Sequence, residues 1–241
     1  MTNKNKIICA IDKAEMNQAL GLISQIKNHV GMVKLGLEFF SQNGPAGVKK
    51  ITQENIPIFL DLKLHDIANT VAASVRELTK IGVDILTIHA SGGSEMIKAA
   101  VKAADEVSQQ YKIKKPLIIA VTILTSLDDA DLKQIGFTGA PEDMALKLAR
   151  LAKESGADGV VCSAHEIKIM RENLPENFKI ITPGIRTAEQ ISQQNINDQK
   201  RVLTPKDAVN LGADYLVIGR AISADSDPEN AAKEILASLT D

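Results

Sequence analysis

Eight short apolar runs rich in β-branched residues recur along this 241-residue chain, at intervals of roughly 20 to 35 residues. They are Ile7 to Ile11, Met32 to Leu37, Ile58 to Leu64, Ile85 to His89, Leu117 to Leu124, Gly159 to Ser163, Lys179 to Pro183 and Tyr215 to Gly219. Stretches with helical spacing separate them, such as Ile67 to Leu78 and Ser94 to Val107. Parallel strands covered by helices are near-continuously apolar, and eight such units fill the length of a closed barrel. We therefore predict the α/β class and a single (β/α)8 barrel domain over residues 1–241.

The alternative fold is an open, doubly wound sheet, which usually carries a glycine-rich turn after its first strand. Here that turn reads Asp12-Lys-Ala-Glu-Met and contains no glycine. A dinucleotide-binding site of this type is therefore disfavoured.

Composition limits the classes of partner. The chain has 28 Lys and Arg against 30 Asp and Glu, a formal net charge of -2, so no basic footprint for nucleic acid or a membrane surface is expected. The apolar runs are far shorter than the ~20 residues of a membrane span. Cys9 and Cys162 each lie inside an apolar run, which indicates core thiols in a reducing compartment rather than a disulfide or a metal site. We expect a cytoplasmic protein with a small-molecule ligand.

The segment Asp61-Leu-Lys63-Leu-His-Asp66 places two carboxylates around one ammonium at the end of the third run. Residues two apart in a strand share a face, so Asp61 and Lys63 should point one way and Leu62 the other. Crowding these charges costs desolvation and like-charge repulsion unless a site uses them. An ordinary surface ion pair is the alternative interpretation, since such pairs are common.

Polar residues at the ends of the other runs favour the functional interpretation, because barrel active sites form at the C-terminal ends of strands. They are Asp12, Lys34, His89, Thr125, Ser126, Arg186 and Arg220, the last of which follows Gly219. Gly184, Gly219 and Arg220 fit a phosphate site, in which small residues permit close approach and arginine grips bidentately. A helix cap with a surface arginine would give the same pattern. His89 is as compatible with hydrogen-bonded support as with a catalytic base, so we rank it below the lysines.

These motifs together resemble the orotidine 5'-phosphate decarboxylase family, in its bacterial branch, almost end to end. They are Asp61-Leu-Lys63-Leu-His-Asp66-Ile-Ala-Asn-Thr70, Val33-Lys34-Leu-Gly, Thr87-Ile-His89-Ala-Ser-Gly-Gly, Val121-Thr-Ile-Leu-Thr125-Ser, Thr182-Pro-Gly-Ile-Arg186, Asp198-Gln199-Lys-Arg201 and Val217-Ile-Gly-Arg220. The resemblance implies conversion of orotidine 5'-monophosphate to uridine 5'-monophosphate and carbon dioxide in de novo pyrimidine synthesis. It implies no cofactor and no metal, and a homodimer.

The resemblance also implies a role for each residue. Lys63 would be the proton donor, within a charged network formed by Lys34, Asp61, Lys63 and Asp66. Asp12 and Lys34 would hold the ribose, Thr125 and Ser126 would lie beside the pyrimidine, and Asp66 and Thr70 would reach across a dimer interface. Arg186, Gln199, Gly219 and Arg220 would bind the phosphate.

The stretch between Arg186 and Gln199 is longer than the bacterial pattern leads us to expect. Residues 187–198 are polar, and either a lid that closes over the site or a surface insertion fits them. Gln193 and Gln194 are rivals of Gln199 for the phosphate.

Three other functions compete with the decarboxylase. A magnesium-dependent sugar-phosphate decarboxylase or aldolase of related barrels shares the Asp-x-Lys-x-x-Asp pattern, although we expect a small Ala-Gly pair after the second Asp, where this chain has Ile67-Ala-Asn-Thr. A Schiff-base aldolase needs a neutral lysine, which two neighbouring carboxylates oppose. A nucleotide-binding protein without turnover is disfavoured because the charged residues are all present.

Overall fold

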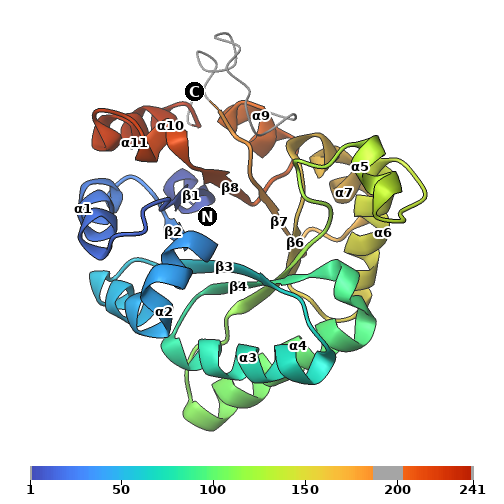
Figure 1. The fold of residues 1–241 in the computed structure, drawn as a ribbon. Coiled ribbons are helices and arrows are strands. Elements are labelled where there is room, and N and C mark those ends of the chain that lie inside the picture. The colour runs from blue at the N-terminus through green and yellow to red at the C-terminus, as the bar shows by residue number, and fades with distance from the viewer. Residues whose placement is uncertain (1, 187–202, 240–241) are drawn as a thin grey trace.

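A computed structural model of the chain describes residues 2–186 and 203–239, and its strands form a closed parallel barrel (Figure 1). The strands are β1 (Ile7–Ala10), β2 (Met32–Leu35), β3 (Ile58–Leu64), β4 (Ile85–His89), β5 (Leu117–Val121), β6 (Gly159–Val161), β7 (Lys179–Thr182) and β8 (Tyr215–Ile218). Each strand pairs with the next one in sequence, and β8 closes the barrel on β1, where Cys9 lies between Val33 and Ile218. The predicted (β/α)8 fold is confirmed.

Several strands are shorter than the apolar runs that predicted them. The strand β2 ends at Leu35, because Gly36 already precedes the next helix and Leu37 is its exposed first residue. The strand β5 ends at Val121, and Leu124 lies in the turn that follows it. The residues beyond each strand are therefore free to enter the loops at the mouth of the barrel.

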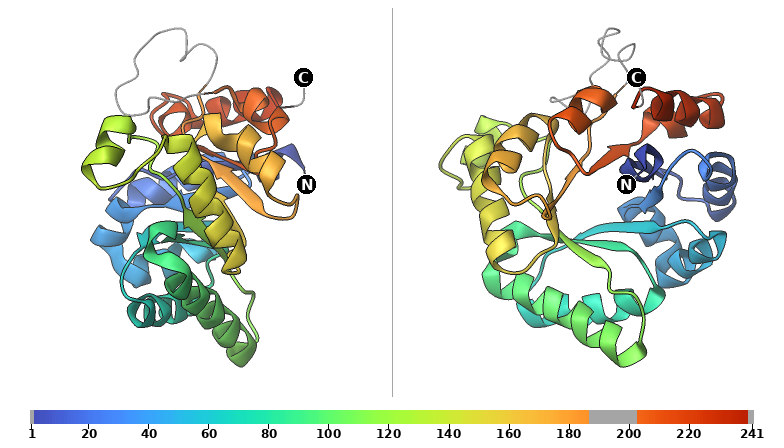
Figure 2. Two further views of the ribbon diagram at one scale, coloured as in Figure 1. Left: turned by 90° about the vertical axis from the view of Figure 1, so that its right-hand side faces the viewer. Right: turned by 180° about the vertical axis from the view of Figure 1, so that it is seen from behind.

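Helices surround the sheet on its outer side in every view (Figures 1 and 2). They are α1 (Met16–Ile26), α2 (Leu37–Ile51), α3 (Ala68–Ile81), α4 (Gly93–Tyr111), α5 (Asp129–Gln134), α6 (Pro141–Glu154), α7 (Ile167–Asn173), α9 (Pro205–Asn210), α10 (Arg220–Ser223) and α11 (Pro228–Ala237). The helical spacing read from the sequence corresponds to α3 and α4, both slightly longer than predicted. None of the described helices is long and apolar enough to cross a membrane.

Two apolar layers pack against the sheet. One fills the barrel interior with residues such as Ile8, Phe59 and Val217, and the other lies between the sheet and the helices. Cys9 and Cys162 are free thiols buried in the outer layer, as predicted for core cysteines. Each strand contributes to both layers, which explains the near-continuous apolar runs.

Three aspartates fasten the N-terminal edge of the barrel, at the end opposite the polar strand ends. Asp84, Asp158 and Asp214 precede β4, β6 and β8, and each carboxylate accepts a hydrogen bond from the backbone N–H of the neighbouring earlier strand. The donors are Ile58, Ile118 and Ile180, at 3.0, 2.8 and 2.9 Å. In barrels of this fold, residues at this end serve stability, and the opposite end is left for chemistry.

Candidate active site

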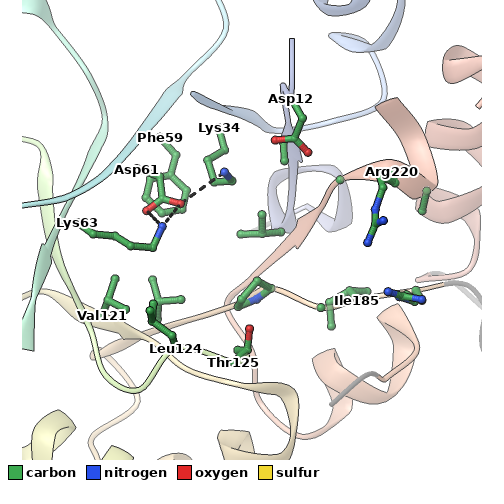
Figure 3. A pocket seen from close by; sticks show the side chains of 18 of the residues that line it. Asp12, Lys34, Phe59, Asp61, Lys63, Val121, Leu124, Thr125, Ile185 and Arg220 are labelled. Atoms are coloured by element: carbon green, nitrogen blue, oxygen red, sulfur yellow. Dashed lines mark hydrogen bonds and ion pairs between the residues drawn. The ribbon is translucent and has the colours of Figure 1, made fainter. Parts of the chain in front are cut away.

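A pocket of about 520 Å³ opens where the C-terminal ends of the strands converge, on top of the apolar interior of the barrel. Figure 3 shows labelled side chains from β2, β3 and β5, from the segments after β1, β5 and β7, and from the start of α10 around it. Its polar and glycine lining consists of Asp12, Lys34, Asp61, Lys63, Thr125, Gly184, Arg186, Gly219 and Arg220. The structure thus brings together polar strand ends that are far apart in the sequence.

A charged cluster of Lys34, Asp61 and Lys63 occupies one end of the pocket (Figure 3). The Lys63 Nζ atom lies 2.9 Å from both carboxylate oxygens of Asp61, and Lys34 Nζ lies 3.4 Å from Asp61 Oδ2. One carboxylate therefore holds two ammonium groups close to each other. The alternative interpretation, an ordinary solvated surface ion pair, does not agree with the structure, because Asp61 is only 8% exposed.

The environment of Asp61 keeps it ionised. Burial by itself would raise the pKa of this carboxyl group, but the charges of Lys34 and Lys63 and the hydrogen bonds from Lys63 and Thr87 outweigh it. The net effect is a pKa below the ordinary value. At neutral pH the cluster holds one carboxylate between two cations.

The backbone at Lys63 departs from a regular strand. Asp61 and Lys63 do face the pocket while Leu62 and Leu64 pack in the outer layer, as the alternation predicted. However, the pairing of β3 with β4 shifts between Leu60 and Leu64, and Lys63 has a left-handed φ of 51°. Bulges of this kind re-aim side chains beside active sites, and a non-glycine residue in this region is strained.

The sequence analysis assigned no role to Thr87, which contacts this cluster directly. Its hydroxyl donates a hydrogen bond to Asp61 Oδ1 at 3.0 Å and accepts one from the Lys63 backbone N–H at 2.8 Å. The available signal was a polar residue in the middle of the apolar run Ile85 to His89, since buried polar groups are the informative exceptions.

Two arginines and two glycines form the other end of the pocket. Arg186 follows β7 and Arg220 begins α10, and Arg220 lies well away from the charged cluster in Figure 3. Gly184 has a φ of 79°, which favours glycine, and a Cβ on Gly219 would lie 3.3 Å from Asp12 Oδ2. This end suits an anionic group that approaches the backbone closely.

Apolar side chains also line the pocket, beside the charged ones. Phe59, Val121, Leu124, Ile185 and Val217 are among them, and Phe59 and Val217 belong to the interior layer of the barrel. A ligand with a weakly polar part and one anionic terminus matches this mixed lining.

Three predicted site residues lie outside the lining that the described residues give the pocket: Asp66, Thr70 and Ser126. All three are exposed. Within a single chain Asp66 lies apart from the charged cluster, because β3 ends at Leu64 and the Asp66 carboxylate accepts a hydrogen bond from the N–H of Ile67 at 2.6 Å. Its place in the network across a dimer interface stays a prediction. Residues 187–198, with Gln193 and Gln194, and also Gln199, lie outside the described residues.

The geometry of His89 favours a supporting role. Its Nδ1 lies 2.7 Å from the Ser91 hydroxyl, and its ring stacks on that of His65 with 5.3 Å between centroids. Burial lowers its pKa, and the charges of His65 and Lys63 add to this effect. A neutral imidazole is therefore favoured at neutral pH.

The acidic side chains do not gather into a metal-ligand set in the part of the chain that the structure describes. Within residues 2–186 and 203–239, no group of three or more His, Cys, Asp or Glu side chains is placed to hold a metal ion.

Comparisons with known proteins agree with these features. The model of the orotidine 5'-phosphate decarboxylase / HUMPS family matches residues 5–235. Orotidine 5'-phosphate decarboxylase of Wolbachia pipientis is 47% identical over 98% of this chain and 100% of its own, and that of Paramagnetospirillum magneticum is 47% identical over 98% of each. The crystal structure of orotidine 5'-phosphate decarboxylase from Lactobacillus acidophilus superimposes with a TM-score of 0.84, at 37% identity over 98% of this chain and 99% of that one. The chain therefore belongs to the orotidine 5'-phosphate decarboxylase / HUMPS family.

Proposed function

We propose that this protein decarboxylates orotidine 5'-monophosphate to uridine 5'-monophosphate and carbon dioxide. The observation that carries the proposal is the Lys63 ammonium, which Asp61 holds at 2.9 Å through both oxygens at one end of a pocket whose other end carries Arg186 and Arg220. A cation fixed at one end and an anion-binding group at the other match a pyrimidine ring joined to a phosphate. Relatives named for this activity, over nearly the whole chain, support it.

Lys63 would supply the chemistry at the ring. When the bond between C6 and the carboxylate breaks, its electron pair stays on C6 as a carbanion with little resonance relief. A positioned ammonium stabilises charge that develops beside it, and in a site that excludes water this effect is large. The Lys63 Nζ then gives a proton to C6, and solvent restores the proton to the amine.

Asp61 and Lys34 would prepare Lys63 for this step. The Asp61 carboxylate fixes the direction of the Lys63 ammonium through contacts of 2.9 Å to both of its oxygens, so that the proton donor is in place when substrate arrives. Lys34 Nζ lies 3.4 Å from Asp61 Oδ2 and adds a second positive charge beside the carboxylate. Together with Asp12, Lys34 would hold the ribose hydroxyls. A substrate carboxylate beside Asp61 would also be repelled in the ground state, a contribution that is secondary in this scheme.

The phosphate would supply binding energy that orients the ring. Arg186, Arg220 and Gly219 are the residues proposed for this role, together with Gln199 from the sequence pattern. Remote binding energy of this kind can be used to position the reacting carbon and exclude water. Closure of residues 187–198 over the site remains a prediction from the sequence, to be tested by deleting 192–196 and measuring kcat/KM.

A homodimer would explain the position of Asp66 and Thr70. Both are exposed on one chain, and Ile67 between them is 72% exposed although it is large and apolar. In a dimer these residues would enter the partner's site. Mixed Lys63→Ala and Asp66→Ala chains should then regain one intact site per heterodimer, whereas persistent inactivity after subunit exchange would place both residues in the same chain's site.

The decisive test is the loss of orotate absorbance from orotidine 5'-monophosphate with purified protein in excess EDTA, beside Lys63→Ala. Turnover that resists EDTA and disappears in the variant supports the proposal, including its independence of a metal cofactor. Activity on a sugar phosphate that requires magnesium would instead assign the protein to the magnesium-dependent alternative. Binding of uridine 5'-monophosphate without any turnover would favour a nucleotide-binding protein. We also propose a cytoplasmic location, consistent with this metabolic role.

A further inference from the structure

The hydroxyl of Thr87 is a buried polar group beside the charged cluster to which the proposed reaction assigns no role. Thr87 is 0% exposed, in the middle of β4, and its strand neighbours Leu86 and Ile88 are apolar and buried. A polar group at such a position costs free energy unless its hydrogen bonds are satisfied. The question is what its hydroxyl does there.

The register between β3 and β4 places Thr87 opposite the irregular part of β3. Leu60 pairs with Leu86 and Leu64 pairs with Ile88, so the three residues 61–63 face Thr87 alone. A bulge leaves backbone groups without their normal ladder partners. The N–H of Lys63 is such a group, and Thr87 Oγ1 accepts its hydrogen bond at 2.8 Å.

The direction of both hydrogen bonds is fixed by chemistry. The backbone N–H of Lys63 can only donate and the ionised Asp61 carboxylate can only accept, so the Thr87 hydroxyl must receive from the first and give to the second. The same carboxylate pairs with the Lys63 side chain at 2.9 Å. Thr87 therefore closes a ring that joins the main chain of Lys63 to its own ammonium through Asp61.

We propose that Thr87 is a positioning residue, which holds Lys63 in its left-handed conformation and orients the Asp61 carboxylate so that the Lys63 ammonium points into the pocket. The inference rests on the proposed function, in which Lys63 delivers the proton. Thr87 itself lies outside the pocket lining that the described residues form, so it acts through its two neighbours. A catalytic side chain that shifts by up to an ångström from its productive position lowers the reaction rate, so the residues that fix its position affect the rate as well.

The test compares Thr87→Val with the unmodified protein. Valine matches the shape of threonine but lacks the hydroxyl, so it removes both hydrogen bonds. We expect kcat/KM for orotidine 5'-monophosphate to fall by about 10- to 100-fold, mainly through kcat, the range in which a lost buried hydrogen-bond partner falls. The affinity for uridine 5'-monophosphate should change less than threefold, since Arg186 and Arg220 are untouched.

A second readout does not depend on activity. The hydrogen bond from Thr87 is one of the interactions that lower the pKa of Asp61, so Thr87→Val should raise that pKa. The Asp61 carboxyl can be followed by ¹³C NMR of protein labelled at aspartate, without substrate. In the active enzyme, the acidic limb of the pH profile of kcat/KM should move to higher pH in the same variant.

The controls separate positioning from general packing. Thr87→Ser keeps the hydroxyl and should retain most of kcat. Thr87→Ala differs from Thr87→Ser only by the hydroxyl, so it should show the same loss of kcat as Thr87→Val and replaces that variant if the valine protein folds poorly. Thr79→Val makes the same chemical change at a buried threonine of α3 whose hydroxyl has no hydrogen-bond partner among the described residues, and it should leave both readouts unchanged.

The outcomes distinguish this inference from the function on which it rests. An unmodified protein that does not decarboxylate the substrate would overturn the proposed function, and the pKa of Asp61 would still decide the role of Thr87. Active protein with the same kcat and the same Asp61 pKa in Thr87→Val would overturn the positioning role. Equal losses in Thr87→Ser and Thr87→Ala would also overturn it, because they would make the methyl group, not the hydroxyl, responsible.

Discussion

Replacing Asp61 with asparagine removes the negative charge that holds two ammonium groups together. Asparagine keeps the size of the side chain and an oxygen that can accept the hydrogen bond from Thr87. Lys34 and Lys63 remain, with side chains 15% and 33% exposed, and among the described residues neither ammonium has an ion pair other than the one with Asp61. We expect the Asp61→Asn variant to unfold more easily than the unmodified protein.

The magnitude follows from the two distances. At an effective dielectric constant of about 20, the pairs at 2.9 and 3.4 Å attract by about 6 and about 5 kcal/mol, most of which the desolvation of Asp61 cancels. Removing one member of a buried pair typically costs about 3–5 kcal/mol. Because water reaches Lys63, we expect about 2–3 kcal/mol, or about 4–12 °C in Tm for a chain of this length.

The effect has a defined pH dependence. The pKa of Asp61 is lowered in the folded state, so its ionised form contributes stability above the unfolded pKa of about 3.9, and this contribution is lost as the pH falls through the folded pKa. The difference between the two proteins should stay constant from pH 7 to about pH 5 and narrow only below about pH 4. Urea denaturation followed by far-ultraviolet circular dichroism suits a chain without tryptophan.

The matched control is Asp143→Asn, which makes the same change at an exposed carboxylate in the first turn of α6. Its loss should stay below about 1 kcal/mol, the range of a surface charge near a helix terminus. An Asp61→Asn variant as stable as the unmodified protein at pH 7 would refute the reasoning. It would mean that the burial of Asp61 cancels all of its attraction to the two lysines.

Three further predictions address other parts of the molecule. Gly159→Ala should lower the free energy of unfolding by about 3 kcal/mol, because the new Cβ would collide with the Lys179 carbonyl oxygen in β7. An unchanged urea midpoint would show that β6 and β7 can move apart without cost. Gly219→Ala should raise KM several-fold with a smaller change in kcat, since its Cβ would crowd Asp12 at 3.3 Å; an equal fall in kcat would move this glycine from binding to the chemistry. His89 should titrate below 6.5 by ¹H NMR, and because its pKa is lowered on folding, stability should decrease as the pH falls below 6.5; a midpoint at or above that value would contradict its burial as the cause.

Much of the site could be predicted because a parallel barrel brings the residues at the C-terminal ends of its strands together at one face. Asp12, Lys34, Lys63 and Arg220 are distant in sequence, yet each follows or ends a strand, and all parallel strands end at the same mouth. Asp66 shows the limit of this reasoning. It is three residues beyond Lys63, but the chain has already turned toward α3, so proximity in sequence does not bring it into the same chain's pocket.

The sequence alone therefore determined the strand and helix periodicity, the barrel and the faces of Asp61 and Lys63, because these depend on local spacing and on the shared direction of parallel strands. The tertiary structure decided the bulge in β3, the left-handed conformation of Lys63 and the contact of both residues with Thr87. These depend on the register between β3 and β4, which is set by packing across the whole sheet rather than by the residues of either strand.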